Sequence, residues 1–240
     1  MKLLVANWKM NPSSAAEAKK LAKATDDAQV IICPPFLFLE QVGSVLKKAS
    51  LGAQNVFWEE SGAYTGEVSS EQLKKVGAKY VIIGHSERRR YLHEDDTMIS
   101  KKVKAVLECG LIPILAVGEN AEERSQQKTL DVIKNQLDTD LSLLLGIKMI
   151  PQLIIAYEPV WAIGSGQSDD PKETVKIIKF AKEFIKDHGL KIKDLRFLYG
   201  GSVNSNNVKG FLQHEEIDGF LIGGASLKSD EMKKIIMLIK

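Results

Sequence analysis

Short apolar runs and helical apolar stripes alternate along the chain. The short runs are rich in β-branched residues, a composition typical of strands that are buried on both faces. Eight such runs occur. They predict strands over Leu3–Asn7, Val30–Cys33, Leu51–Gln54, Tyr80–Gly84, Ile112–Val117, Leu153–Tyr157, Arg196–Tyr199 and Gly219–Ile222.

Apolar residues spaced by three or four positions predict helices between these strands. The clearest stripes are Ile99, Val103, Val106 and Leu107, then Ile177, Phe180, Ala181, Phe184 and Ile185, and finally Met232, Ile235, Ile236 and Ile239. Two helix starts are also marked. Ser14 and Glu17 fit a capping box, and Asp170 precedes a proline at the first helical position.

The alternation of strands and helices predicts the fold class. Strands that alternate with helices form a parallel sheet, and eight units in about 240 residues favour a closed barrel over an open doubly wound sheet. We therefore expect an α/β protein with a single domain over residues 1–240, built as a (β/α)8 barrel of the TIM type.

Composition narrows the cellular context. The net charge of +2 is too small to suggest nucleic acid or a membrane surface as a partner. Cys33 and Cys109 lie far apart and form neither a metal-binding spacing nor a disulfide framework. No apolar run approaches the ~20 residues that span a bilayer, and the chain enters strand-like sequence at Leu3. We expect a cytoplasmic protein.

Chemically active side chains gather where the predicted strands end. The C-terminal strand ends of a barrel form its active face, so these groups should share one rim. They are Asn7 and Lys9, His85 and Glu87, Glu158, Gly200-Gly201-Ser202 and Gly223-Gly224. Each group taken alone has a simpler explanation: Lys9 as a surface lysine, the glycine pairs as turns. The glycines after the last two strands also suit a phosphate bound by backbone N–H groups.

The segment from Tyr157 to Gly166 suggests a base beneath a lid. Glu158 ends a buried strand, Pro159 stops that strand, and an apolar, glycine-containing loop follows. Such a loop can reverse direction and exclude water when it closes over a carboxylate. The alternative is an ordinary surface turn with Glu158 as a solvated cap.

In all these places the sequence resembles the triosephosphate isomerase family. The motifs that carry the resemblance cover the chain from end to end: Asn7-Trp8-Lys9-Met10-Asn11, Gly84-His85-Ser86-Glu87-Arg88-Arg89, Ala156 to Gly164, Tyr199-Gly200-Gly201-Ser202-Val203 and Gly223-Gly224-Ala225-Ser226-Leu227. Three positions depart from the family's usual pattern, and none is a catalytic group. Ser165 and Gln167 differ in the lid, and Ala116 replaces a common cysteine.

The resemblance implies the interconversion of dihydroxyacetone phosphate and D-glyceraldehyde 3-phosphate through an enediolate, in glycolysis and gluconeogenesis, with no cofactor and no metal. It implies Glu158 as the base, His85 as proton shuttle and hydrogen-bond donor, and Lys9 as the cation, supported by Glu87. The substrate-binding groups would be Asn7, Lys9, Gly164, Ser202, Gly223 and Gly224.

The long loop over residues 55–70 has an apolar tip, Gly62-Ala63-Tyr64-Thr65-Gly66. It could be a self-packed Ω-loop. The resemblance implies instead that it inserts into a second subunit and brings Thr65 near that subunit's Asn7, Lys9 and His85, which makes a homodimer.

Two other functions stay open on the sequence alone. One is a different phosphate-binding barrel that isomerises a sugar phosphate, although such an enzyme has no reason to carry Lys9, His85 and Glu158 in these contexts. The other is a catalytically silent barrel retained as a binding protein. A silent barrel would be indicated by the loss of a catalytic group, and the sequence retains all of them.

Overall fold

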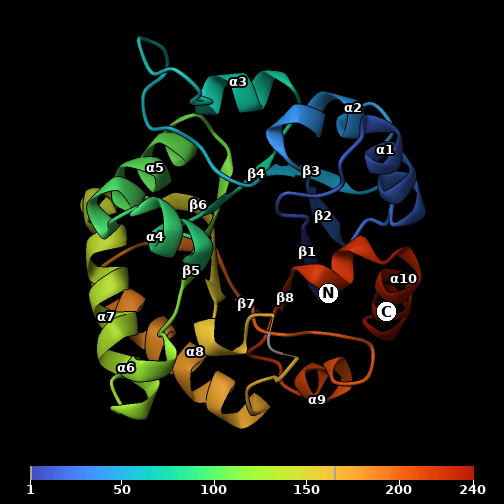
Figure 1. Cartoon of the computed structure of the whole chain (residues 1–240). Helices are drawn as coiled ribbons and strands as arrows, with labels where there is room; N and C mark the ends of the chain where they lie inside the picture. Colours follow the sequence, from blue (N-terminus) through green and yellow to red (C-terminus); the bar gives the residue numbers. More distant parts are fainter. Residues whose placement is uncertain (1, 165) are drawn as a thin grey trace.

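Eight parallel strands follow one another around a closed barrel (Figure 1). A computed structural model describes residues 2–164 and 166–240 of the chain. The strands are β1 Leu3–Asn7, β2 Val30–Cys33, β3 Ser50–Ala53, β4 Tyr80–Ile83, β5 Ile112–Val117, β6 Ile150–Tyr157, β7 Ile192–Tyr199 and β8 Gly219–Ile222. The barrel closes where β1 pairs with both β2 and β8, with Leu4 opposite Val30 on one side and Phe220 on the other. The predicted (β/α)8 barrel is confirmed.

Helices surround the barrel (Figure 1). They lie in the connections between strands, except the last one, which follows β8. They are α1 Ala15–Ala24, α2 Leu39–Gly43, α3 Ser70–Lys75, α4 Ser86–Leu92, α5 Asp96–Glu108, α6 Ala121–Ser125, α7 Thr129–Asp140, α8 Pro171–Asp187, α9 Val208–Leu212 and α10 Ser229–Leu238. The described residues also form short 3-10 helices: η1 Phe36–Phe38, η2 Ser142–Leu144, η3 Val160–Ala162 and η4 Gly224–Leu227.

Both predicted N-caps are present, but only one of the two hydrogen bonds of the predicted Ser14–Glu17 capping box forms. Asp170 accepts a hydrogen bond from the Lys172 N–H at 2.8 Å, and Pro171 occupies the first position of α8. Ser14 caps α1 by accepting from the Glu17 N–H at 3.3 Å. The Glu17 carboxylate contacts the hydroxyl of Ser13 instead of closing a reciprocal capping box.

The core has two parts, which the sheet separates. Inside the barrel lies a small cluster of strand residues: Val5, Ile31, Cys33, Ile82, Ile114, Ile154, Ala156, Leu198 and Leu221. The larger core packs the outward strand residues against the helices, and the predicted stripes of α5, α8 and α10 face it. The strands are therefore buried on both faces, as their apolar composition predicted, and the barrel can hold side chains fixed at its rim.

Four predicted strands differ in their bounds from the structure. β6 begins at Ile150 and β7 at Ile192, three and four residues before the predicted starts. β3 runs from Ser50 to Ala53, and β4 ends at Ile83, one residue before its predicted end. Among the added residues, Gln152, Lys193 and Asp194 carry polar side chains and are at least partly exposed, and the Gln152 amide donates to Asp194 at 2.8 Å. These polar positions hid the strand starts in the sequence pattern.

Candidate active site

A cavity of about 380 Å³ opens at the C-terminal ends of the strands. The loops after β1, β4, β6, β7 and β8 supply its walls. The structure brings together around it every residue predicted to act in catalysis or substrate binding: Asn7, Lys9, His85, Glu158, Gly164, Ser202, Gly223 and Gly224. A volume of this size suits a small ligand.

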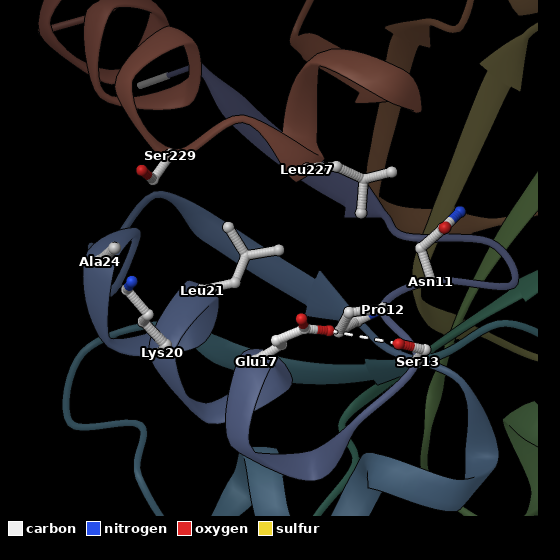
Figure 2. A pocket seen from close by; sticks show the side chains of 9 residues that line it. All are labelled: Asn11, Pro12, Ser13, Glu17, Lys20, Leu21, Ala24, Leu227 and Ser229. Carbon is white, nitrogen blue, oxygen red and sulfur yellow. Dashed lines mark hydrogen bonds between the residues drawn. The ribbon is translucent and has the colours of Figure 1, made fainter.

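A larger hollow, of about 480 Å³, lies beside the rim between α1 and the segment after β8 (Figure 2). Leu21, Ala24 and Leu227 form its apolar wall, and Glu17 and Lys20 are exposed at its edge. It lacks an imidazole, and its one carboxylate is solvated. The smaller cavity is the better candidate because a buried base, an imidazole and an ammonium group meet there.

Glu158 is the buried carboxylate of the cavity, with a side chain only 2% exposed. Its Oε2 accepts a hydrogen bond from the Ser86 N–H at 3.0 Å, and its Oε1 lies 3.2 Å from Nε2 of His85. The side chain reaches this position because residue 200 is a glycine. A Cβ on Gly200 would lie 2.8 Å from Cγ of Glu158, closer than packed carbon atoms approach.

His85 caps the first turn of α4. Its Nδ1 accepts a hydrogen bond from the Glu87 N–H at 3.2 Å. A ring nitrogen that accepts a hydrogen bond carries no proton, so the proton of the neutral imidazole is on Nε2. Nε2 faces the cavity and Glu158, and His85 can therefore donate a hydrogen bond there while neutral.

Lys9 has a left-handed backbone, with φ of 53°. Two amide side chains hold it in place. Its N–H donates to Oδ1 of Asn7 at 3.1 Å, and its carbonyl accepts from the Gln54 amide at 2.9 Å. The Lys9 ammonium donates to Oε1 of Glu87 at 2.5 Å. A Cβ on Gly223 would lie 3.2 Å from Cε of Lys9, so that glycine leaves room for the lysine chain.

Glycines and one serine form the remaining wall, at the ends of β7 and β8. Ser202 donates from its hydroxyl to the Ala162 carbonyl at 2.6 Å and so ties the loop after β7 to the start of the lid. Gly164 has a φ of 70°, a conformation that favours glycine. Gly223 and Gly224 follow β8 and line the cavity without side chains.

A buried polar cluster holds both ends of the lid, the segment from Pro159 to Ser168. Glu119 accepts hydrogen bonds from the Trp161 indole at 3.0 Å and from the Tyr157 hydroxyl at 3.1 Å. Arg124 lies 4.1 Å from the centre of the Trp161 ring and also donates to Asp169 at 2.9 Å. Ser165, one of the two lid positions where the sequence departs from the family pattern, lies outside the described residues.

Burial dominates the electrostatics of this cluster. It raises the pKa of Glu119, against the opposing effect of the bonds from Trp161 and Tyr157 and the charge of Arg124. Burial raises the pKa of Asp169 in the same way, against the charge of Arg124. The sequence pattern gave Glu119 no role, because its partners come from other parts of the chain.

Two of the predicted supporting residues stand apart from the cavity wall. Glu87 reaches the site through Lys9 and is 42% exposed. Thr65 is exposed on the loop after β3, which projects past α3 away from the barrel (Figure 1). Within one chain the structure therefore does not bring Thr65 to the other site residues.

Besides Glu119 and Arg124 at the lid, sequence reasoning missed Gln54 and Lys102. Gln54 bridges the carbonyls of Lys9 and Cys33, at 2.9 and 2.8 Å, but it gave no signal because it ends an ordinary strand. Lys102 is buried and donates to Asn55 and Glu94 at 2.9 and 2.5 Å, beneath the loop after β3. A signal for Lys102 was present, since its position continues the apolar stripe of α5.

Among residues 2–164 and 166–240, no three His, Cys, Asp or Glu side chains form a group that could hold a metal ion. In the same part of the chain, no helix has both the length and the apolar character needed to cross a bilayer.

Comparisons with known proteins identify close relatives. A family model described as triosephosphate isomerase matches residues 2–239. The chain is 46% identical over 246 residues to a protein named triosephosphate isomerase from Dictyoglomus turgidum, and the match covers 98% of each chain. Proteins of the same name from Alkaliphilus metalliredigens and Aquifex aeolicus are each 42% identical, again over 98% of both chains.

Proposed function

We propose, on the premise that this chain belongs to the triosephosphate isomerase family, that the rim cavity carries out the family's reaction with Glu158, His85 and Lys9. The chain is an isomerase that interconverts dihydroxyacetone phosphate and D-glyceraldehyde 3-phosphate, a step of glycolysis and gluconeogenesis. The observation that carries the assignment of residues is the 3.2 Å approach of the buried Glu158 carboxylate to Nε2 of His85, in a cavity that also holds Lys9.

Glu158 acts as the base. Its carboxylate takes a proton from the carbon next to the substrate carbonyl, the electron pair moves onto the carbonyl oxygen, and an enediolate forms. The protonated Glu158 then returns the proton to the neighbouring carbon, which gives the isomer. No bond to the protein forms, so the enzyme needs only to orient the base and to stabilise the negative charge that appears on oxygen.

His85 and Lys9 stabilise that charge. The neutral His85 carries its proton on Nε2, which in this structure faces Glu158. We expect the substrate oxygen to accept this N–H when it binds, which frees the carboxylate for the carbon-bound proton. The same N–H can move protons between the two substrate oxygens. Lys9 adds positive charge, and fixed donors of this kind need no reorganisation during the reaction.

The other predicted groups hold the substrate. Asn7 fixes the backbone of Lys9 and adds a hydrogen bond, and Glu87 orients the lysine. The backbone N–H groups of Gly164, Ser202, Gly223 and Gly224 bind the phosphate. The lid closes over the ligand and excludes water, which protects the enediolate. Its two ends are held by the cluster around Glu119 and Arg124.

We also propose a homodimer formed through loop 55–70, with Thr65 of each chain beside Asn7, Lys9 and His85 of the other. Apolar side chains on the loops after β1 to β4 support this proposal, because neighbouring strand ends share one side of the rim. The most exposed are Met10, Leu37 and Tyr91, at 94%, 80% and 64%, followed by Leu92 and Tyr64 at 58% and 44%.

Charge supports the same interface. The projecting loop carries Glu59, Glu60 and Glu67, all exposed, whereas α4 carries the exposed Arg90. Two copies related by a twofold axis can place the acidic loop of each near Arg90 of the other. We further propose that residues 1–240 act as one domain in the cytoplasm, where the unpaired Cys33 and Cys109 stay reduced.

A coupled assay tests the function. Conversion of D-glyceraldehyde 3-phosphate is followed through the reduction of dihydroxyacetone phosphate by NADH and an added dehydrogenase. We expect rapid turnover by the purified protein, and competitive inhibition by 2-phosphoglycolate, whose carboxylate resembles the enediolate. A folded protein that neither turns over the substrate nor binds this inhibitor would contradict the proposal.

A further inference from the structure

Two lysines with different surroundings line the cavity. Of the described residues that line it, Lys9 and Lys228 are the two lysines. The Lys9 ammonium is bound to Glu87 at 2.5 Å, so part of its charge is already neutralised. Lys228 is exposed, and no carboxylate in residues 2–164 and 166–240 comes within ion-pair distance of it. The substrate phosphate brings two negative charges.

The backbone places Lys228 on the side of the cavity where the phosphate is expected. Lys228 comes directly after η4, four residues beyond Gly224, and its N–H donates to the Ala225 carbonyl at 3.2 Å. Asn204, from the loop after β7, also lines the cavity there. Lys228 thus has a fixed backbone and a free side chain beside the two glycine loops.

The charges around Lys228 leave its ammonium available. The charge of Lys228 acts on Glu231, which follows it by three residues in the first turn of α10. The Glu231 carboxylate accepts a hydrogen bond from the Ser205 N–H at 2.6 Å, which lowers its pKa, and the charges of Lys234 and Lys228 lower it further. The Glu231 carboxylate is therefore held by the Ser205 N–H and forms no ion pair with the Lys228 ammonium.

We propose that Lys228 is a substrate-positioning residue, which draws the phosphate dianion into the cavity and balances the charge that the Lys9–Glu87 pair leaves uncompensated. The inference rests on the function proposed above and extends it to a residue outside the base, the imidazole and the glycine loops. A cation at the mouth of a cleft raises the association rate of an anion, by about 10-fold or more at low salt. Salt screens this effect over roughly 10 Å at 0.1 M.

The experiment compares Lys228→Gln with Lys234→Gln. Lys234 is exposed on α10, which begins directly after Lys228, and it also acts on Glu231, so the control removes the same charge away from the cavity. For Lys228→Gln we expect kcat/KM to fall about tenfold at low ionic strength, with most of the change in KM and with a loss that shrinks as salt increases. Lys228→Arg should restore most of the activity, and turnover of unphosphorylated glyceraldehyde should not change.

Binding of inorganic phosphate, measured by calorimetry on the same proteins, gives a readout that does not require turnover. We expect Lys228→Gln to weaken it about tenfold and Lys234→Gln to leave it unchanged. Equal values of kcat/KM, salt dependence and phosphate affinity in the two variants would overturn the proposal and make Lys228 an ordinary surface lysine. A wild-type protein that binds phosphate but does not isomerise the substrate would instead contradict the proposed function.

Discussion

At the scale of single residues, the site depends on side chains placed in positions that cost conformational energy or leave little room. Lys9 adopts a left-handed backbone, which costs roughly 1–2 kcal/mol for a residue with a Cβ. Asn7 and Gln54 hold that conformation through hydrogen bonds to its N–H and its carbonyl. Strain kept in place by neighbours in this way is typical of functional positions.

Two replacements of Lys9 separate the contribution of its ammonium group to activity from the cost of its left-handed backbone to stability. We expect Lys9→Ala and Lys9→Gly to be folded and nearly inactive, because both remove the ammonium group. Lys9→Gly should be more stable than Lys9→Ala by about 1 kcal/mol, since glycine adopts the left-handed conformation without a Cβ clash. Urea unfolding and the coupled assay measure the two effects. Full activity in either variant would exclude Lys9 from the mechanism.

Shortening Glu158 tests the base. Glu158→Asp retracts the carboxylate by on the order of 1 Å, and a displacement of this size can reduce the rate about 100-fold. We expect kcat to fall by that factor or more and KM to change little, because the phosphate contacts lie elsewhere. Glu122→Asp, an exposed carboxylate on α6, is the control and should behave like the wild type. Near-normal turnover of Glu158→Asp would remove this residue from the role of base.

At the scale of elements, the sequence predicted the strands best where both faces are buried. β1, β2, β5 and β8 have the predicted bounds. The starts of β6 and β7 were missed because Pro151 and Asp194 are unusual in a buried strand, and both lie where the strands extend below the core. The rim residues were found through their motifs. Gln54, Lys102 and Arg124 were missed because their roles depend on partners distant in sequence.

One connection gives a pH-dependent contribution to stability. Asp26 accepts hydrogen bonds from the N–H groups of Lys47, Lys48 and Ala49, between α2 and β3. Partial burial raises its pKa, but these bonds outweigh burial and bring the pKa below its ordinary value of 3.8. A carboxyl group whose pKa is lowered on folding stabilises the protein above the unfolded pKa and loses this effect as pH falls through the folded pKa.

Asp26→Asn measures this contribution. The variant should lose about 1–2 kcal/mol of unfolding free energy at pH 7, because the uncharged amide accepts fewer and weaker bonds. The difference from wild type should shrink as the pH is lowered below about 4. Asp187→Asn, at the exposed end of α8, should stay within about 0.5 kcal/mol of wild type at both pH values. A difference that grows with acidity would contradict this account of Asp26.

At the scale of the whole molecule, each active site of the proposed dimer is complete only when the loop of the other chain contacts it. The barrel has its own core, so subunits that separate should remain folded. Removal of Tyr64 and Thr65 should yield a monomer with activity reduced roughly 100-fold, since the side of the rim that fixes Lys9 and His85 loses its support. Sedimentation and the coupled assay on the same sample test both parts.

A matched deletion provides the control for this experiment. Removing Gly146 and Ile147 shortens the connection from η2 to β6, on the opposite end of the barrel from the rim. This variant should remain dimeric and active. A wild-type monomer with full activity would refute the dimer, and a Tyr64–Thr65 deletion that stays dimeric would show that other contacts hold the subunits together.

The exposed position of Thr65, clear of its own rim, also has a consequence for mixtures of defective chains. A chain with Lys9→Ala has a dead site but an intact loop, whereas a chain without Tyr64 and Thr65 keeps Lys9 but lacks a loop to offer. Paired with each other, they assemble one site in which the second chain supplies Lys9 and the first supplies the loop. Two preparations that are almost inactive apart should therefore complement each other when they are unfolded and refolded together.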